Sequence, residues 1–399
     1  MAQEQQVKES SYNSSCDAYF ETIQNRKKLP HELQKSLTEA FARIPVSSFP
    51  EVPGGKVIEI LADTTIADAV KILSACKILS APVRNPDEGD TMNWRDRYLG
   101  IIGYSAIILW VLESSVGCLG ALALGVTGPV AVTGLTVAAV GAAVAGVVAT
   151  EKGFGKDAPT AASHLGEDFY KIILQEEPFK STKVRSIQKS YRWVPFLPMS
   201  TDSSMLIVLL LLSKYRLRNV PVIEAGQPVV KNYITQSAVV HGHERCKGRD
   251  WFDIISACPY LTWDFHSCLA MSNDLILEAF KRMRDNQIGG LPVVEGPKNW
   301  IVGNVSIRDI RHLLLRPELF SNYWQLRVMD FMNTITASSE EAGKIKQPIT
   351  CKLDSTLGSV IHSLACKSVH RIYVVNGNED EVIGVITLRD VISCFIGKN

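Results

Sequence analysis

Four segments of the chain share one internal spacing, and this repetition constrains the fold more than any other feature. In each segment an Asp or Asn stands 19 positions before a Pro or Tyr that begins a short β-branched run. The four pairs are Asp63/Pro82, Asp202/Pro221, Asn273/Pro292 and Asp354/Tyr373. In three segments a second strand is expected 11 positions later, at Asn232, Gly303 and Gly384. Equal offsets in four places predict an internal repeat.

Each repeat is predicted to contain a helix, two strands and a second helix, with a short strand ahead of them. The Asp or Asn is expected to be the N-cap of the first helix, since these residues accept hydrogen bonds from helix-terminal amides. Apolar residues then recur at helical spacing, as Ile66, Ala69, Val70 and Leu73 do in the first copy. One unit of about 60 residues is too small to bury both faces alone, so we expect the units to pair.

The chain is therefore predicted to be an α/β (α+β) protein with four repeats and one long insertion. The expected divisions are a disordered polar tail at 1–30, an N-terminal helix at 31–45, repeats at 46–113, 181–245, 259–317 and 340–397, and an apolar insertion with its linker at 114–180. The N-terminal helix is predicted from Leu33, Leu37 and Phe41, which share one face, and it should end before Pro45.

The insertion contains 114–150, a stretch without any charge, in which Val130–Ala149 is long enough to cross a bilayer. A single crossing would place the first and second repeats on opposite sides of the membrane, where they could not pair. We therefore favour a flexible or partner-covered hydrophobic loop. Membrane association, as a re-entrant hairpin for example, and an unusual exon product are the alternatives.

Composition excludes several classes of protein. The 42 basic and 41 acidic residues leave a net charge of +1, so we expect no general attraction for nucleic acid. Nine scattered cysteines without a CxxC motif predict reduced thiols in a cytoplasmic or nuclear protein. The polar first 30 residues contain no apolar core of a secretory signal.

Motifs of catalysis are not found in the sequence. There is no phosphate-binding loop, no glycine-rich dinucleotide motif after a strand and no suggestive Ser/His/Asp set. His241 and His243 look like a metal pair, but no Cys, Asp or Glu stands at metal-ligand spacing from them. We expect a protein that is not an enzyme and holds no metal.

Two pairs of motifs resemble CBS (cystathionine-β-synthase) repeats. They are Gly-Gly-Leu-Pro-Val-Val-Glu (289–295) with Gly-Asn-Val-Ser-Ile-Arg-Asp (303–309), and His-Arg-Ile-Tyr-Val-Val (370–375) with Gly-Val-Ile-Thr-Leu-Arg-Asp (384–390). Four copies without a catalytic domain resemble the γ regulatory subunits of SNF1-related and AMP-activated kinases. The stretches 190–198, 209–222 and 233–237 are similar to the plant form of that subunit.

The resemblance implies a fold and a ligand. In the family, adjacent repeats pair into two Bateman modules that form a disk, and adenine nucleotides lie in clefts between repeats. A carboxylate at the start of the last helix would hold the ribose, a Ser or Thr would reach ribose or phosphate, and His and Arg would neutralise the phosphates. The residues at these positions are Thr235, Arg218, Ser306, Arg308, Asp309, His370, Arg371, Thr387, Arg389 and Asp390.

The motif is incomplete in two copies, because Ala106 and Ala238 replace the carboxylate there. Asp309 and Asp390 could also be simple helix caps, and Arg308 and Arg389 could be surface salt-bridge residues.

The implied function is that of a non-catalytic subunit. It would assemble with a kinase catalytic subunit and a β-type scaffold subunit, with AMP, ADP or ATP as regulatory ligands and no required cofactor. A stand-alone CBS energy sensor for another enzyme or a transporter, attached to a membrane through 114–150 or not, is the alternative.

Overall fold

A computed structural model describes residues 29–87, 93–112, 181–190, 196–215, 217–244, 269–316, 319–320, 325–338, 347–376 and 380–396. The tail and most of the insertion, including the stretch at 114–150, lie outside these ranges. Within them no helix is both long and apolar enough to cross a bilayer.

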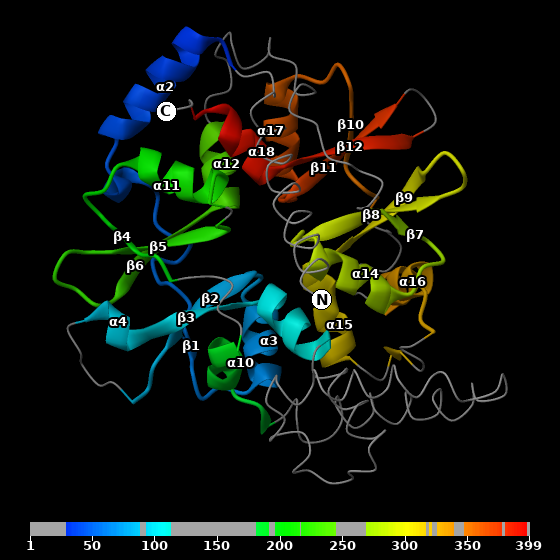
Figure 1. The fold of residues 1–399 in the computed structure, drawn as a ribbon, viewed down its shortest axis with the longest axis horizontal. Helices are drawn as coiled ribbons and strands as arrows, with labels where there is room; N and C mark the ends of the chain where they lie inside the picture. Colours follow the sequence, from blue (N-terminus) through cyan, green and yellow to red (C-terminus); the bar gives the residue numbers. More distant parts are fainter. Residues whose placement is uncertain are drawn as a thin grey trace, which may run out of the picture.

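The four repeats have the same order of elements (Figure 1). Repeat 1 contains β1 (Ile60–Leu61), α3 (Ile66–Ala75), β2 (Ser80–Arg84), α4 (Trp94–Arg97), β3 (Tyr98–Gly103) and helical residues 104–112. Repeat 2 contains β4 (Met199–Ser200), α11 (Met205–Ser213), β5 (Asn219–Ile223), β6 (Val230–Thr235) and α12 (Gln236–Glu244). Repeat 3 contains β7 (Ala270–Met271), α14 (Ile276–Asp285), β8 (Gly290–Glu295), β9 (Trp300–Ser306), η4 (Ile307–Asp309) and α15 (Ile310–Leu315). Repeat 4 contains β10 (Thr350–Lys352), α17 (Leu357–Cys366), β11 (Arg371–Asn376), β12 (Glu381–Thr387) and α18 (Leu388–Cys394).

Each repeat has a three-stranded unit in which the short first strand pairs parallel with the central strand and the third strand pairs antiparallel with it. The equal spacing in the sequence appears as equal register. The central-strand residue that defines the repeat faces Ile101, Tyr233, Asn304 or Val385 of the neighbouring strand.

The shared Asp or Asn is not the N-cap of the helix that follows it, and that prediction is wrong. The N-cap lies two positions further on in every repeat, at Thr65, Ser204, Leu275 and Thr356. The Asp or Asn occupies the turn after the short strand instead. The hydroxyls of Thr65 and Thr356 accept the amides of Asp68 and Ser359, each at 3.1 Å, and so cap the helix themselves.

Connecting segments also cap the first helix of repeats 1 to 3, and in repeats 2 and 3 no side chain does so. The first amide of a helix has no partner inside the helix, and here it donates to the carbonyl of a segment that crosses the helix start. These bonds join Ile66 to Thr182 at 2.9 Å, Met205 to Ile44 at 2.8 Å and Ile276 to Leu326 at 2.9 Å. A carboxylate cap is therefore not required at these positions.

The same segments continue as helices that cover the repeats. They are α10 (Val184–Ser190), α2 (His31–Arg43) and α16 (Val328–Ser338). Val184 and Ile187 of α10 are buried in the core of repeat 1, although the sequence boundaries assign residues 181–190 to repeat 2. The Gln34 side chain of α2 donates to the carbonyls of Cys394 and Ile396 at 3.2 and 2.9 Å, so α2 also touches repeat 4.

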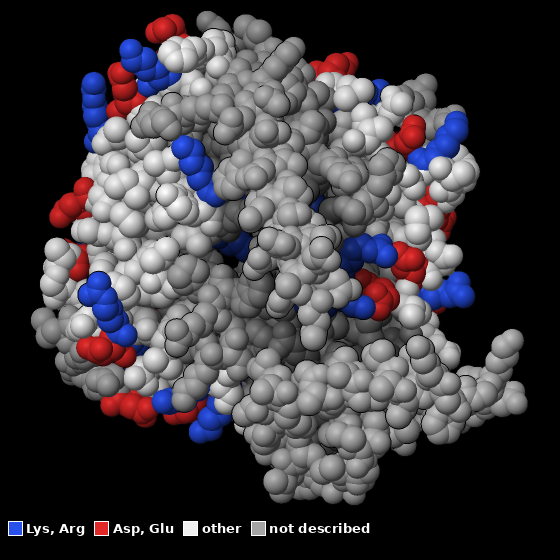
Figure 2. All heavy atoms as spheres, viewed as in Figure 1, with Lys and Arg blue, Asp and Glu red and all other residues white. Residues whose placement is uncertain are grey.

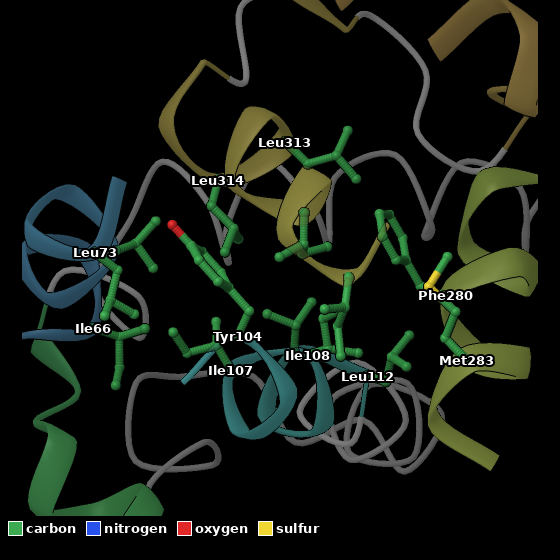
Figure 3. Close-up of a cluster of buried hydrophobic side chains, with 14 of the residues drawn as sticks. Ile66, Leu73, Tyr104, Ile107, Ile108, Leu112, Phe280, Met283, Leu313 and Leu314 are labelled. Atoms are coloured by element: carbon green, nitrogen blue, oxygen red, sulfur yellow. The ribbon is translucent and has the colours of Figure 1, made fainter. Parts of the chain in front are cut away.

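Two large cores join repeats that are not consecutive in the chain. Helices of repeats 1 and 3 share one core, where Ile66 and Leu73 of α3 and residues of helix 104–112 face α14 and α15 (Figure 3). Helices of repeats 2 and 4 share the other, in which α12 packs on α17 and α18. Neither core is completed by one repeat, which agrees with the expectation that the units pair.

The sheets make the remaining contacts, between consecutive repeats. Strands β12 and β9 are neighbours through Glu381 and Trp300, and this joins repeats 3 and 4 into one six-stranded sheet. Tyr98 of repeat 1 stacks on Phe196 at 4.8 Å and lies in a small cluster with Val230 of repeat 2. Repeats 1 and 2 thus form one module and repeats 3 and 4 the other, and the four units surround a common centre (Figure 1).

Candidate ligand-binding site

A cavity of about 2430 Å³ lies where the four repeats meet. Figure 2 shows one face of the molecule, with Lys and Arg side chains beside the hollow at its middle. All ten residues predicted as site residues line this cavity: Arg218, Thr235, Ser306, Arg308, Asp309, His370, Arg371, Thr387, Arg389 and Asp390. The structure therefore brings the candidates together, and their role in binding stays a prediction.

Strand register explains this convergence. In each repeat the first residue of the central strand pairs with the last residue before the closing helix. These pairs are Ser80 with Gly103, Asn219 with Thr235, Gly290 with Ser306 and Arg371 with Thr387. Because every repeat presents this same end to the centre, residues far apart in the chain line one space.

Equivalent positions also meet within each module. Asn219 begins the central strand of repeat 2, and its Nδ2 donates to the hydroxyl of Ser80, which begins that of repeat 1, at 2.9 Å. In the other module, the guanidinium of Arg371 lies over Gly290, where an added Cβ would be 1.6 Å from Nη1. Such a Cβ would also lie 2.7 Å from the main-chain carbonyl oxygen of Val305, which cannot move aside as a side chain can, so glycine is favoured at 290.

Positive charge gathers at the centre. The guanidinium of Arg218 donates from Nη1 to the Ser105 hydroxyl at 3.1 Å. Burial, followed by the nearby charges of Arg371 and Arg389, lowers the pKa of Arg218 to about 10. A buried cation held beside other positive charges costs free energy, and an anion placed among them would offset that cost.

Three residues of the cavity wall have a buried polar atom without a hydrogen-bond partner among the described residues. The atoms are Nε of Arg308, Oδ1 of Asn219 and the hydroxyl of Tyr233. Burial is also the main reason for the lowered pKa of Arg308, with Arg311 adding repulsion. Unpaired buried polar atoms are rare in folded proteins, and at a cavity wall they indicate a ligand or ordered water.

His370 is uncharged at neutral pH. Burial, and then the charges of Arg371, Arg308 and Arg218, lower its pKa to about 4. It can thus offer a hydrogen bond to an anion at pH 7, but it does not supply the positive charge expected of it.

Both motif carboxylates stabilise the ends of their own helices. Oδ2 of Asp390 accepts the amide of Thr387 at 2.9 Å and its hydroxyl at 2.6 Å. Oδ2 of Asp309 accepts the amide of Ser306 at 2.8 Å. These are capping boxes, with the carboxylate at the third helical position and not at the N-cap. In each box the carboxylate oxygen that accepts the amide is Oδ2.

Comparisons with known proteins now decide the family. The CBS domain family matches residues 270–316 and 342–397. An Arabidopsis thaliana protein, SNF1-related protein kinase regulatory subunit gamma-1-like, is 62% identical over 96% of this chain and 92% of its own length. The chain belongs to the γ regulatory subunits of SNF1-related protein kinases. The Arabidopsis regulatory subunit gamma-1 is also similar to this γ subunit, at 34% identity over 97% of the chain and 90% of that protein.

A solved structure supports the fold of the γ subunit. A Methanocaldococcus jannaschii protein described as an archaeal homologue of γ-AMPK superposes with a TM-score of 0.56, at 17% identity, over 86% of this chain and 97% of that one. The arrangement as paired CBS repeats is therefore confirmed. Family membership also makes the chain a regulatory, non-catalytic subunit.

The remaining predicted roles can now be compared with the structure of the γ subunit. Arg308 and Arg389 are half-buried and line the cavity, so neither lies on the fully exposed surface. His243 is buried and stacks on Phe395 at 4.1 Å, whereas His241 is exposed. Positions two apart on a helix do not face each other, so this pair cannot chelate one ion.

Sequence reasoning missed several residues of the γ subunit's cavity wall. Asn304 accepts hydrogen bonds from the hydroxyl of Tyr373 and from Nη1 of Arg371, the latter at 3.3 Å, and so orients the arginine. Ser80 and Asn219 could have been predicted from the repeat alignment, because they occupy in repeats 1 and 2 the position of Arg371 in repeat 4. Asn304 stands in the middle of a strand, and no motif distinguishes it.

Proposed function

We propose that this γ subunit binds an adenine nucleotide in the central cavity and assembles with a kinase catalytic subunit and a β-type scaffold subunit. The observation that carries the first part is the cluster of Arg218, Arg371 and Arg389 at the wall of one cavity, where burial and then the charges of Arg371 and Arg389 lower the pKa of Arg218. Phosphate groups provide the compact negative charge that arginine forks bind well.

Asp309 and Asp390 complete the proposed site. A nucleotide with its phosphates among the arginines would place its ribose near the helix starts, where both carboxylates line the cavity. Repeats 3 and 4 supply both carboxylates, and repeat 2 supplies Arg218. A bound nucleotide therefore touches both modules.

Regulation would follow from this bridging position. If the kinase complex has two conformations that differ in how the modules meet, a nucleotide that binds one arrangement more tightly shifts the balance toward it. No cofactor is required for this role, and the nucleotide is an exchangeable effector. We expect the complex in the cytoplasm, the nucleus or both.

Calorimetric titration with AMP, ADP and ATP tests the binding proposal. Wild type should bind at least one of them, and Arg371→Gln should weaken that binding roughly ten- to hundredfold, since charge-assisted hydrogen bonds contribute about 1.5–3 kcal/mol. The control is Arg84→Gln, because Arg84 lies on repeat 1 in a loose 3.8 Å pair with Glu59, away from the cavity. Equal heats for wild type and Arg371→Gln would disprove the site.

Co-purification tests the assembly proposal separately. The chain, expressed with the catalytic and β-type subunits of an SNF1-related kinase, should retain both through size-exclusion chromatography. Elution of the chain alone would contradict assembly without affecting the nucleotide experiment.

A further inference from the structure

Glu244, His362 and Cys366 form a cluster of metal-ligating side chains outside the central cavity. Their ligand atoms all lie within 4.8 Å of one another. Nδ1 of His362 is 3.1 Å from Oε1 of Glu244 and 3.4 Å from Sγ of Cys366. We propose that these three residues form a zinc site that links repeat 2 to repeat 4.

Secondary structure holds the three donors in place. His362 and Cys366 are four positions apart on α17, so they share one face of the helix. Glu244 is the last residue of α12, which packs against α17 in the core shared by repeats 2 and 4. The donors thus come from two helices that the apolar core already holds side by side (Figure 1).

The donor spacing suits a tetrahedral zinc ion. Zinc bonds of about 2.0–2.1 Å to nitrogen or oxygen and about 2.3 Å to sulfur put tetrahedral ligand atoms roughly 3.3–3.6 Å apart. The two separations from His362 Nδ1 are close to this range. Only small side-chain movements are needed to bring the three atoms around one ion.

Charge and ligand softness favour zinc over other ions. A thiolate and a carboxylate carry two negative charges, which balance Zn²⁺, and the neutral imidazole completes the set. Mg²⁺ and Ca²⁺ prefer all-oxygen sites, so the thiol and the imidazole argue against them. Binding releases the thiol proton, and affinity should therefore fall as the pH decreases.

The position of the site gives it a consequence for the assembly. Three protein ligands leave a fourth position for water or for a donor from another molecule. His362 is 46% exposed and Glu244 is 29% exposed at the side chain, so an ion can enter and leave. Because α12 and α17 belong to different modules, zinc would strengthen the contact between the modules without touching the nucleotide cavity.

Cobalt titration of the full chain tests the site. Co²⁺ replaces Zn²⁺ in such sites and gives a thiolate charge-transfer band. Wild type should bind one equivalent of Co²⁺ and show this band, and Cys366→Ser should lack the band. His362→Gln should weaken metal binding roughly tenfold or more, because even residues that only hydrogen-bond to a metal ligand change metal affinity by that much. Native mass spectrometry should find one zinc ion in wild type, and zinc should raise its melting temperature.

Matched controls are present in the chain. Cys76→Ser removes another exposed thiol, and His241→Gln removes an exposed histidine on the same helix as Glu244. Both variants should keep the cobalt band and the zinc-dependent shift in melting temperature. A band that persists in Cys366→Ser, or a wild type that takes up no stoichiometric cobalt or zinc, would overturn the proposal. Circular dichroism confirms that each variant is folded.

Discussion

The guanidinium of Arg371 occupies the space above Gly290, where a Cβ would lie 1.6 Å from Nη1 and 2.5 Å from Cζ. These two residues hold the same position in repeats 4 and 3. The pair therefore places the largest side chain at that position against the smallest, across the middle of one module.

Gly290→Ala should weaken both folding and ligand binding. The new methyl group would also approach the carbonyl of Val305 to 2.7 Å, and backbone cannot move aside as a side chain can. We expect a loss of about 1–3 kcal/mol in the free energy of unfolding by urea, typical of overpacking, and weaker nucleotide binding because Arg371 is displaced.

The control for this variant is Gly242→Ala on α12. An added Cβ meets nothing within 4 Å there, and alanine is favoured over glycine inside a helix by about 0.5–1 kcal/mol. Equal effects of the two substitutions would show that Arg371 does not depend on the glycine.

His243 should make folding sensitive to acid. Burial lowers its pKa from 6.5 to about 4 in the folded protein, so the unfolded chain binds the proton more tightly. Above pH 6.5 His243 is neutral in both states and does not lower the free energy of unfolding. As the pH falls from 6.5 toward 4, the free energy of unfolding decreases by about 3 kcal/mol in total, at ~1.4 kcal/mol per pKa unit. Urea titrations at several pH values should give a smaller loss for His243→Phe, which keeps the ring beside Phe395.

The exposed His241 is the comparison for that experiment. His241→Gln should reproduce the wild-type loss between pH 6.5 and 4, since its side chain is not buried. If His243→Phe loses as much stability as wild type, His243 is not the group responsible.

His370 should make nucleotide binding tighter at lower pH. Burial, and then the charges of three arginines, lower its pKa to about 4. A bound phosphate would offset those charges. The pKa therefore rises on binding, a proton is taken up, and affinity should increase by up to about tenfold between pH 7 and 5.5. His370→Gln should remove that increase in calorimetric titrations, while any remaining pH dependence reflects the phosphate itself.

Asp390 offers a way to separate capping from ribose contact. Asp390→Asn should cost about 1 kcal/mol in the free energy of unfolding, because the amide is a weaker partner for Thr387 than the carboxylate is. For wild type, a 2′-deoxynucleotide should bind more weakly than the ribonucleotide, and in Asp390→Asn this difference should shrink. A difference of the same size in both proteins would leave Asp390 with a capping role alone.

Spacing in the sequence predicted the repeats and the order of their elements, and the resemblance to CBS repeats indicated ten residues that line the cavity. The N-cap assignment failed for two reasons. Thr65 and Thr356 cap their helices two positions after the shared Asp. In repeats 1 to 3 main-chain carbonyls of the segments next to α10, α2 and α16 also accept the first helix amide, and such a contact has no residue-type signal. The pairing of helical cores was also not predictable. Helix α11 is apolar on all sides, from Met205 to Leu212, so no face of it indicates a partner.

The contact of Arg371 with Gly290 needed the structure for a different reason. The repeat alignment shows that the two residues are equivalent, but equivalence does not say that they touch. Only the approach of two units across the middle of a module brings equal positions together, and that approach is set by packing between sheets and not by any local pattern.

The helical cores that the two modules share have a consequence during synthesis on the ribosome. Repeat 1 shares its helical core with repeat 3, and repeat 2 shares its own with repeat 4. Roughly 200 residues separate Ile66 from Ala270, and translation at about 5–20 residues per second needs on the order of 10–40 seconds to add them. The apolar helices of the first half must therefore remain uncovered during that time, when a chaperone can bind them before the second half emerges.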